Sequence, residues 1–270
     1  EGYSNIKDGY DEALLKEVLD NIKDFDKVIV MTGLPENYES EGSDRQDIDL
    51  PTGHLHLIDE ILKINPNVVI TLFAGSQVAM PFSNKVKAIL NCNLLGAASG
   101  RPILDILYGV ESPSGRLATT YPLRIEDDPT TKNFANTNNA IWYTESIFVG
   151  YRYYNTFKKP VLFPFGFGLS YSEFLYSDLE VDREDISLDH KIKVSVNVKN
   201  IGKYPAKEVV QLYVENNESS VYKPRRELRR FSKVFLGVGE EKTVEFTLNY
   251  EDFSYYDVNL NKFHVNKGTY

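Results

Sequence analysis

The sequence predicts two folded domains: a three-layer α/β sandwich built on a parallel sheet, and then an all-β sandwich. In the first half, short continuous apolar runs alternate with segments of helical periodicity, which is typical of a parallel sheet covered on both faces. From residue 175 onward the hydrophobic period changes to two, which indicates antiparallel strands. The length of 270 residues, 42% of them hydrophobic, is sufficient for two cores.

The elements of the first domain follow one another closely within residues 1–125. Apolar residues at helical spacing predict an amphipathic helix over residues 11–25. A second helix is expected from Thr52, as its N-cap, to Asn65, and a third has Pro102 in its first turn. Continuous apolar runs predict buried strands at residues 28–31, 68–73 and 88–90.

The second domain is expected over residues 175–270. Turn signals at residues 200–203 and 237–240 separate its runs of alternating hydrophobicity. Those runs predict antiparallel strands at residues 192–198, 210–214 and 244–248. The sequence therefore predicts a β-sandwich after the α/β domain.

Residues 126–174 connect the two domains and are rich in Tyr, Phe, Pro and Gly. This segment is too apolar for a flexible linker, so we expect it to pack against both domains. Arg152 is expected to pair with Glu145 within that packing. Two interpretations stay open for its aromatic side chains, packing between domains or a platform for stacking sugars. The residues concerned are Tyr151, Tyr153, Tyr154, Phe163, Phe165 and Phe167.

Composition excludes several classes of function. The net charge of −9 offers no positive field for phosphates, so a nucleic acid partner is not expected. Cys92 is the single cysteine, which excludes an internal disulfide. His54 and His56 lie two apart on a predicted helix and are expected at the surface, so no metal site is predicted.

No apolar run approaches the ~18 residues of a membrane span. The first residues show no leader signature, which favours a cytoplasmic location and leaves secretion open.

The loop after the first strand is the candidate for chemistry, because ligands of open parallel sheets bind beyond the carboxyl ends of the strands. Residues 33–45 form an acidic loop that contains one cation, Arg45. A solvated acidic face is the alternative interpretation. The spacing of the acidic residues in this loop does not fit a calcium-binding loop. Residues 96–100 fit neither the nucleophile elbow of a hydrolase nor a dinucleotide-binding fingerprint.

Several blocks in order along nearly the whole chain resemble the C-terminal half of glycoside hydrolase family 3, of the beta-glucosidase type. Gly33-Leu34-Pro35 with Glu39-Ser40-Glu41-Gly42-Ser43-Asp44-Arg45 resembles the family's GLP…ESEGxDR block. Further matches are Asn65-Pro66-Asn67-Val68-Val69, Gly75-Ser76-Gln77-Val78-Ala79-Met80-Pro81-Phe82, Ser112-Pro113-Ser114-Gly115-Arg116-Leu117, Phe148-Val149-Gly150-Tyr151-Arg152-Tyr153-Tyr154 and Phe163-Pro164-Phe165-Gly166-Phe167-Gly168-Leu169-Ser170-Tyr171.

The resemblance implies an α/β sandwich followed by a fibronectin type III-like domain, and it gives Glu41 the role of general acid/base. Asp44 and Arg45 are expected to orient the loop by ion pairing, and Glu39 is the rival acid. Retaining glycosidases use two carboxyls about 5 Å apart. The family carries its nucleophile on a TIM-barrel domain, which these residues lack. We therefore expect these residues alone to be inactive, with the barrel supplied by the same chain or by another.

The expected substrate is a terminal non-reducing beta-D-glucosyl residue, with no cofactor, and a homo-oligomer is possible. Two alternatives stay open, a non-catalytic carbohydrate-binding or scaffolding module and a beta-xylosidase or arabinosidase of the same family. Departures from the family pattern leave the sugar preference undecided. Ala97 and Ala98 stand where the family usually has Gln-Glu, and Phe82 replaces a Trp.

Overall fold

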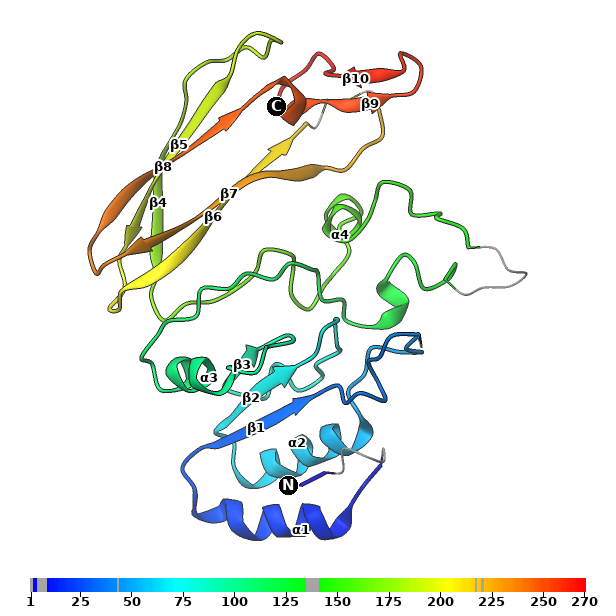
Figure 1. Ribbon diagram of the computed structural model, residues 1–270, viewed down its shortest axis with the longest axis vertical. Coiled ribbons are helices and arrows are strands. Elements are labelled where there is room, and N and C mark those ends of the chain that lie inside the picture. The colour runs from blue at the N-terminus through cyan, green and yellow to red at the C-terminus, as the bar shows by residue number, and fades with distance from the viewer. Residues whose placement is uncertain (1, 4–8, 43, 135–140, 217, 220) are drawn as a thin grey trace. The chain divides into compact units, whose positions relative to one another are not determined.

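The computed structural model describes residues 2–3, 9–42, 44–134, 141–216, 218–219 and 221–270. It divides into two compact units (Figure 1). The first unit comprises Glu1–Ile103 with Tyr121–Thr131, and the second comprises Leu104–Thr120 with Lys132–Tyr270. Most of residues 126–174, which the sequence predicts to connect the two domains, therefore belong to the second unit. Within the described ranges, no helix combines the length and the apolar character that crossing a membrane requires.

A three-stranded parallel sheet of order β1-β2-β3 forms the centre of the first unit. Val28 pairs with Val68, and Val69 pairs with Ala88. The elements are α1 (Glu12–Asn21), η1 (Ile22–Asp24), β1 (Val28–Gly33), α2 (Thr52–Ile64), β2 (Val68–Phe73), β3 (Ala88–Asn91) and η2 (Ile125–Asp127), while α3 (Gly100–Leu107) continues into the second unit. The predicted parallel sheet is confirmed, with β1 and β3 slightly longer than expected.

The core of this unit lies between the helices and the sheet. Figure 1 shows α1 and α2 together on one face of the sheet. α2 buries Leu57, Ile58 and Ile61, and every second residue of β2 is fully buried, namely Val68, Ile70 and Leu72. At the end of α2, the Asn65 side chain donates to the Phe25 carbonyl at 2.6 Å and accepts from the Asn67 amide at 2.9 Å. These bonds join the end of α2 to the segments that precede β1 and β2.

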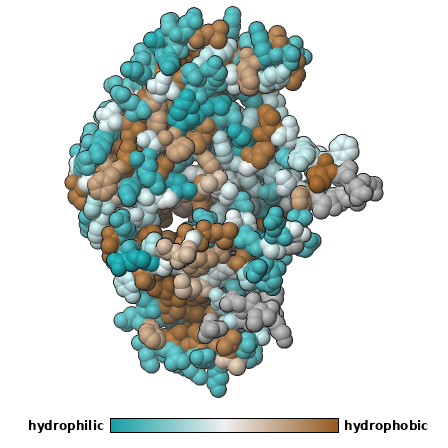
Figure 2. Space-filling model, viewed as in Figure 1, coloured by the Kyte–Doolittle hydropathy of each residue, from teal (hydrophilic) through white to brown (hydrophobic). Residues whose placement is uncertain are grey.

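The described residues leave the other face of β1 exposed. Ile29 is 47% and Met31 55% exposed, whereas Val30 and Thr32 are buried. Hydrophobic side chains accordingly gather at the surface of this unit over the sheet (Figure 2). The α/β fold class is confirmed, and at β1 the face opposite α1 and α2 is exposed among the described residues.

Two predictions about α2 are also wrong. His54 is buried rather than at the surface, because it lies on the inner side of α2, where its Nδ1 is 2.9 Å from Thr32 Oγ1. Thr52 is the first helical residue and not the N-cap, a position that Pro51 occupies without a side-chain hydrogen bond.

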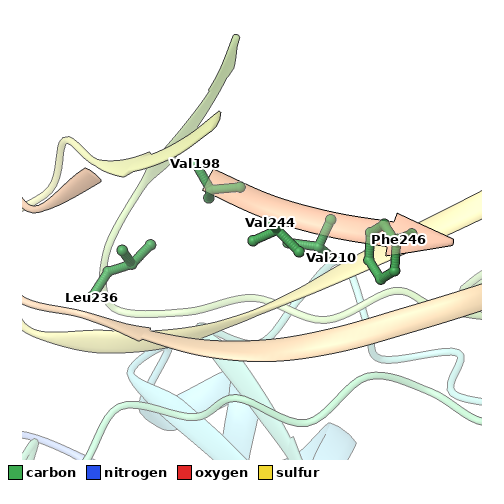
Figure 3. Close-up of a cluster of buried hydrophobic side chains, with 5 residues drawn as sticks. All are labelled: Val198, Val210, Leu236, Val244 and Phe246. Atoms are coloured by element: carbon green, nitrogen blue, oxygen red, sulfur yellow. The ribbon is translucent and has the colours of Figure 1, made fainter. Parts of the chain in front are cut away.

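The second unit contains the predicted β-sandwich. One sheet has the order β4-β5-β8, a second pairs β6 with β7, and β9 with β10 forms a hairpin, with all pairs antiparallel. Its elements are α4 (Tyr151–Thr156), β4 (Phe174–Val181), β5 (Ile192–Asn200), β6 (Ala206–Glu215), β7 (Arg226–Leu236), β8 (Glu241–Leu248), η3 (Tyr250–Phe253), β9 (Tyr255–Asp257) and β10 (Lys262–His264). Figure 3 shows its core cluster of Val198, Val210, Leu236, Val244 and Phe246.

The aromatic residues of the connection pack on one another and on β6. Tyr151 stacks on Phe165 with ring centroids 4.5 Å apart and meets the edge of Tyr213 at 6.1 Å. Its hydroxyl accepts a hydrogen bond from the Leu228 amide at 2.8 Å.

Arg152 does not pair with Glu145, contrary to the expectation. Its Nε instead lies 3.1 Å from a carboxylate oxygen of Glu227. Glu227 lies on β7, 75 residues further along the chain, so the sequence pattern around Arg152 could not show this partner.

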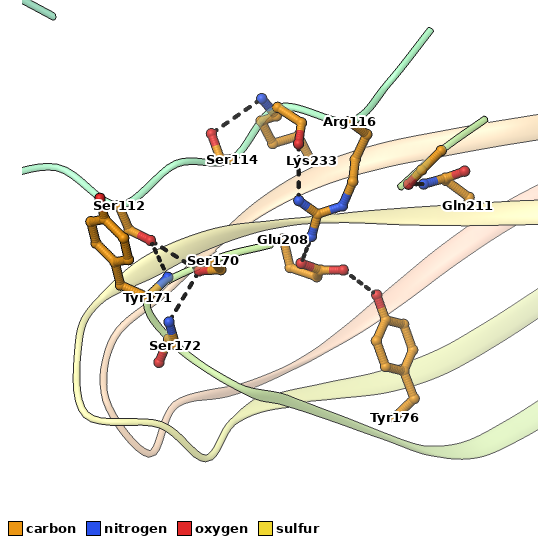
Figure 4. Close-up of polar contacts among 12 residues, drawn as sticks. Ser112, Ser114, Arg116, Ser170, Tyr171, Ser172, Tyr176, Glu208, Gln211 and Lys233 are labelled. Atoms are coloured by element: carbon orange, nitrogen blue, oxygen red, sulfur yellow. Dashed lines mark hydrogen bonds and ion pairs between the residues drawn. The ribbon is translucent and has the colours of Figure 1, made fainter. Parts of the chain in front are cut away.

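A buried ion pair holds the segment before residue 120 on β6 (Figure 4). Arg116 pairs with Glu208, and the two side chains are only 12% and 10% exposed. Tyr176 donates to the other Glu208 oxygen at 2.8 Å, and burial is the main cause that raises the pKa of this tyrosine. Since both oxygens of the buried carboxylate have partners, the charge pair is satisfied.

Glu208→Gln is expected to lower the free energy of unfolding of this unit by about 3 kcal/mol, because it leaves Arg116 buried without its counter-charge. Denaturant unfolding measures the effect. Glu241→Gln is the matched control, since Glu241 lies on β8 in a half-exposed pair with Lys199 and should cost less than about 1 kcal/mol. Equal effects of the two variants would show that the buried pair contributes no more to the free energy of unfolding than the half-exposed pair.

Candidate active site

The loop between β1 and α2 begins where the parallel strands end. The Leu34 amide donates to the Phe73 carbonyl at 2.9 Å, which continues the pairing of β1 and β2 by one residue. Pro35 then starts a turn in which its carbonyl accepts from the amides of Tyr38 and Glu39. The turn brings Glu39 back toward the residues that follow β2.

Glu39 is held by both of its carboxylate oxygens. Oε2 accepts from the Gly75 amide at 2.8 Å, and Oε1 accepts from Ser76 Oγ at 2.7 Å. A Cβ at Gly75 would lie 3.0 Å from Glu39 Oε1 and 2.7 Å from a methyl of Leu94, so a side chain there would require these two side chains to shift. Glu39 therefore joins the loop to the segment after β2.

Arg45 makes a second anchor on the same segment. Its Nη1 donates to Ser76 Oγ at 3.1 Å and to the Gln77 carbonyl at 3.2 Å, and its Nη2 donates to the Asp49 carbonyl at 3.3 Å. Burial is the main cause that lowers the pKa of Arg45, and the charges of Asp47, Glu39 and Asp49 oppose the shift. The guanidinium stays protonated, as arginine does in proteins.

Asp44 lies beside this anchor without taking part in it. Its side chain is exposed, and no residue in the described part of the chain pairs with its carboxylate. Arg45 therefore orients the loop mainly through Ser76 and two backbone carbonyls, with Asp44 outside this set of contacts.

Glu41 lies in the turn between the two anchors. It is exposed, and among the described residues none donates a hydrogen bond to its carboxylate or forms an ion pair with it. Gly42 follows with φ of +85°, a conformation that side-chain-bearing residues rarely adopt. The turn thus presents a carboxylate whose oxygens are available to another molecule or domain.

Tyr121 completes the polar surroundings of this edge of the sheet. It is buried, and its hydroxyl accepts from Asn91 Nδ2, at the end of β3, at 2.9 Å. Burial is the main cause that raises the pKa of Tyr121, with a further increase from the charge of Glu39, while the Asn91 hydrogen bond lowers it. Tyr121 is therefore a neutral group, whose pKa the charge of Glu39 affects, at physiological pH.

Neither Ser76 nor Tyr121 is a candidate from the sequence pattern. Ser76 lies just after a predicted strand of the parallel sheet, at the edge where ligands bind. This position is the feature of the sequence that could have identified it. Within the described ranges, no group of three or more His, Cys, Asp or Glu side chains is arranged to hold a metal ion.

Comparison with known proteins identifies both parts of the chain. Residues 3–171 match the model of the glycosyl hydrolase family 3 C-terminal domain, and residues 208–270 match that of the fibronectin type III-like domain. The thermostable beta-glucosidase B of Acetivibrio thermocellus is 45% identical over 270 residues, which are 100% of this chain and 36% of that protein. The exo-alpha-(1->6)-L-arabinopyranosidase of Bifidobacterium breve is 39% identical over 96% of this chain and 34% of its own length.

Among solved structures, the GH3 beta-glucosidase of Bifidobacterium adolescentis superposes with a TM-score of 0.93 at 38% identity, covering 98% of this chain and 39% of that one. The chain thus spans about a third of the length of the curated relatives it matches. The parallel sheet that the structure describes has three strands, which excludes a TIM barrel within the described residues. The chain belongs to glycosyl hydrolase family 3, of which it carries the C-terminal α/β domain and the fibronectin type III-like domain.

Proposed function

We propose that this chain supplies the general acid/base of a retaining beta-glucosidase and that Glu41 is this group. The carboxylate of Glu41, which has no partner among the described residues and is presented by a loop anchored on both sides, is the observation that carries the proposal. Glu39 is the rival, but both of its oxygens already accept hydrogen bonds that hold the loop.

The nucleophile is a carboxylate of a TIM-barrel domain outside these residues. We place that domain in the same polypeptide, because the relatives are single proteins nearly three times as long as this chain. In the first step, Glu41 gives its proton to the glycosidic oxygen while the nucleophile attacks the anomeric carbon and the aglycone leaves. In the second step, Glu41 takes a proton from water, which attacks the same carbon and releases the sugar and the nucleophile.

Terminal non-reducing beta-D-glucosyl residues are the proposed substrates, because the relatives include proteins named as beta-glucosidases. An arabinosidase is the second candidate. The arabinopyranosidase of Bifidobacterium breve matches 96% of this chain at 39% identity. Since such similar chains occur in enzymes named for different sugars, the sugar preference is set largely by residues outside this chain.

Glu41→Gln in the full-length protein is expected to lower kcat for poor leaving groups by about 10²- to 10⁴-fold, because proton transfer in both steps is lost. For aryl glucosides with good leaving groups, the first step needs little proton donation, so only the second step slows. Azide attacks the glycosyl-enzyme without base assistance, and it should restore turnover and yield the glycosyl azide. Steady-state kinetics with and without azide measure this.

Glu36→Gln is the matched control for that experiment, because Glu36 is an exposed carboxylate of the same loop. It should leave kcat and KM unchanged. Wild-type kinetics in Glu41→Gln would remove Glu41 from the mechanism.

Glu39→Gln is expected to lower activity by loosening the loop that presents Glu41, not by removing a reacting group. It replaces a charged acceptor of two hydrogen bonds, which should cost about 1.5–3 kcal/mol of stability and reduce kcat/KM. Thermal unfolding and the azide assay distinguish the two glutamates, since azide should not restore turnover in Glu39→Gln. Rescue by azide in this variant alone would make Glu39 the acid/base.

Residues 1–270 in isolation are expected to turn over no aryl beta-glucoside, because one carboxylate cannot complete a retaining mechanism. The full-length protein should turn it over. Activity of the isolated chain would place a nucleophile within these residues. Sugar binding without turnover by the full-length protein would favour a non-catalytic carbohydrate-binding module instead.

A further inference from the structure

The segment that follows β2 is fixed in the core of the first unit on both sides of Ser76. Ala74 and Val78 are fully buried, and Met80 and Phe82 are buried after them. Ser76 itself is half-buried between these positions. This segment and the loop after β1 both leave the sheet at the carboxyl ends of their strands (Figure 1). The segment therefore gives the loop a firm base.

The loop after β1 is bonded to that base along its length. Glu39 and Arg45 both form hydrogen bonds with Ser76 Oγ. Further along the loop, the Ile48 carbonyl accepts from the Ala79 amide at 2.7 Å. Because Glu39 and Arg45 meet at a single residue of the base, residues 40–44 have no span to cross and turn away from it. Glu41 lies in this outward turn.

Ser76 Oγ is the point where the two ends of the turn come together. Its single proton is donated to Glu39 Oε1 at 2.7 Å, and one of its lone pairs accepts from Arg45 Nη1 at 3.1 Å. Both bonds have a charged partner, and such bonds are stronger than those between neutral groups. The hydroxyl thus fixes the distance between the two ends of the turn.

Each end of the turn has further contacts that do not depend on Ser76. Glu39 accepts from the Gly75 amide, and Arg45 donates to two backbone carbonyls. Removal of the Ser76 hydroxyl therefore leaves the loop attached to its base but loosens the turn that carries Glu41.

We propose that Ser76 is a positioning residue for the acid/base step. Its hydroxyl holds the ends of the turn together and keeps the Glu41 carboxylate within hydrogen-bond reach of the glycosidic oxygen. Ser76 acts through Glu41 and takes no part in the bond changes. A misplacement of about 1 Å in an active site can cost about 10²-fold in rate. This inference deepens the proposed function and rests on the role proposed there for Glu41.

Leaving-group dependence in the full-length protein distinguishes positioning from general damage. The value of kcat/KM reports the first step, in which an alkyl alcohol needs a proton to leave and 2,4-dinitrophenolate does not. Ser76→Ala should lower kcat/KM for an alkyl beta-glucoside by about 10- to 100-fold, and that for 2,4-dinitrophenyl beta-glucoside by less than about 2-fold. Partial unfolding lowers both values alike and cancels in their ratio. Equal losses for the two substrates would overturn the proposal.

Ser76→Thr and Ser83→Ala are the matched controls. Ser76→Thr keeps the hydroxyl and should stay near the wild-type ratio of the two kcat/KM values. Ser83→Ala makes the same chemical change in the connection between β2 and β3, at a half-buried serine whose side chain has no hydrogen-bond partner among the described residues. It should leave both values unchanged. If Ser76→Thr changes the ratio as much as Ser76→Ala, the hydroxyl does not position the turn.

The double variant Glu41→Gln/Ser76→Ala tests whether Ser76 acts through Glu41. A positioning residue has no effect once the group that it positions is gone, so the two effects should not add. The kcat/KM for the alkyl beta-glucoside should therefore equal that of Glu41→Gln alone. A further loss as large as that of Ser76→Ala in the wild-type background would show independent action and overturn the proposal.

The single variants separate this inference from the proposed function. Wild-type kinetics in Glu41→Gln would remove the proposed function and this inference with it. A loss in Glu41→Gln together with wild-type kinetics in Ser76→Ala would remove this inference alone.

Discussion

Ser76 Oγ joins an anion and a cation of the same loop, and the geometry of the candidate active site depends on this hydroxyl. It donates to Glu39 Oε1 and accepts from Arg45 Nη1, so one side chain satisfies both charges. Hydrogen bonds with a charged partner are stronger than neutral ones. Because Glu39 and Arg45 are fixed on the segment after β2, the turn at Glu41 and Gly42 lies between two anchored positions. Glu41 projects from that turn.

The two glutamates of this loop differ in their contacts, and the roles proposed for them rest on this difference. Glu39 has both oxygens occupied by Gly75 and Ser76, and it stabilises the loop. Glu41, two residues later, has no partner among the described residues. Tyr121, which is buried and hydrogen-bonded to Asn91, adds a neutral group to the same edge of the sheet.

The first unit has an apolar surface that the described residues leave open, the face of β1 that carries Ile29 and Met31. Open apolar surfaces of this kind mark places where other protein packs. This accords with a chain that spans about a third of the length of its relatives. In the second unit, the buried ion pair of Arg116 and Glu208 holds the segment before residue 120 on β6.

The sequence by itself determined the order and kind of the elements, because hydrophobic period is a local property that packing on a sheet enforces. It also determined the family, through blocks such as residues 39–45, and the loop in which the chemistry is expected. Only the tertiary structure decided which groups meet. Glu39 and Ser76 are 37 residues apart, and Arg152 and Glu227 are 75 apart. No local pattern specifies such partners, since contact between distant side chains depends on how the strands and helices are placed. The same placement buried His54 and left Glu41 without a partner among the described residues.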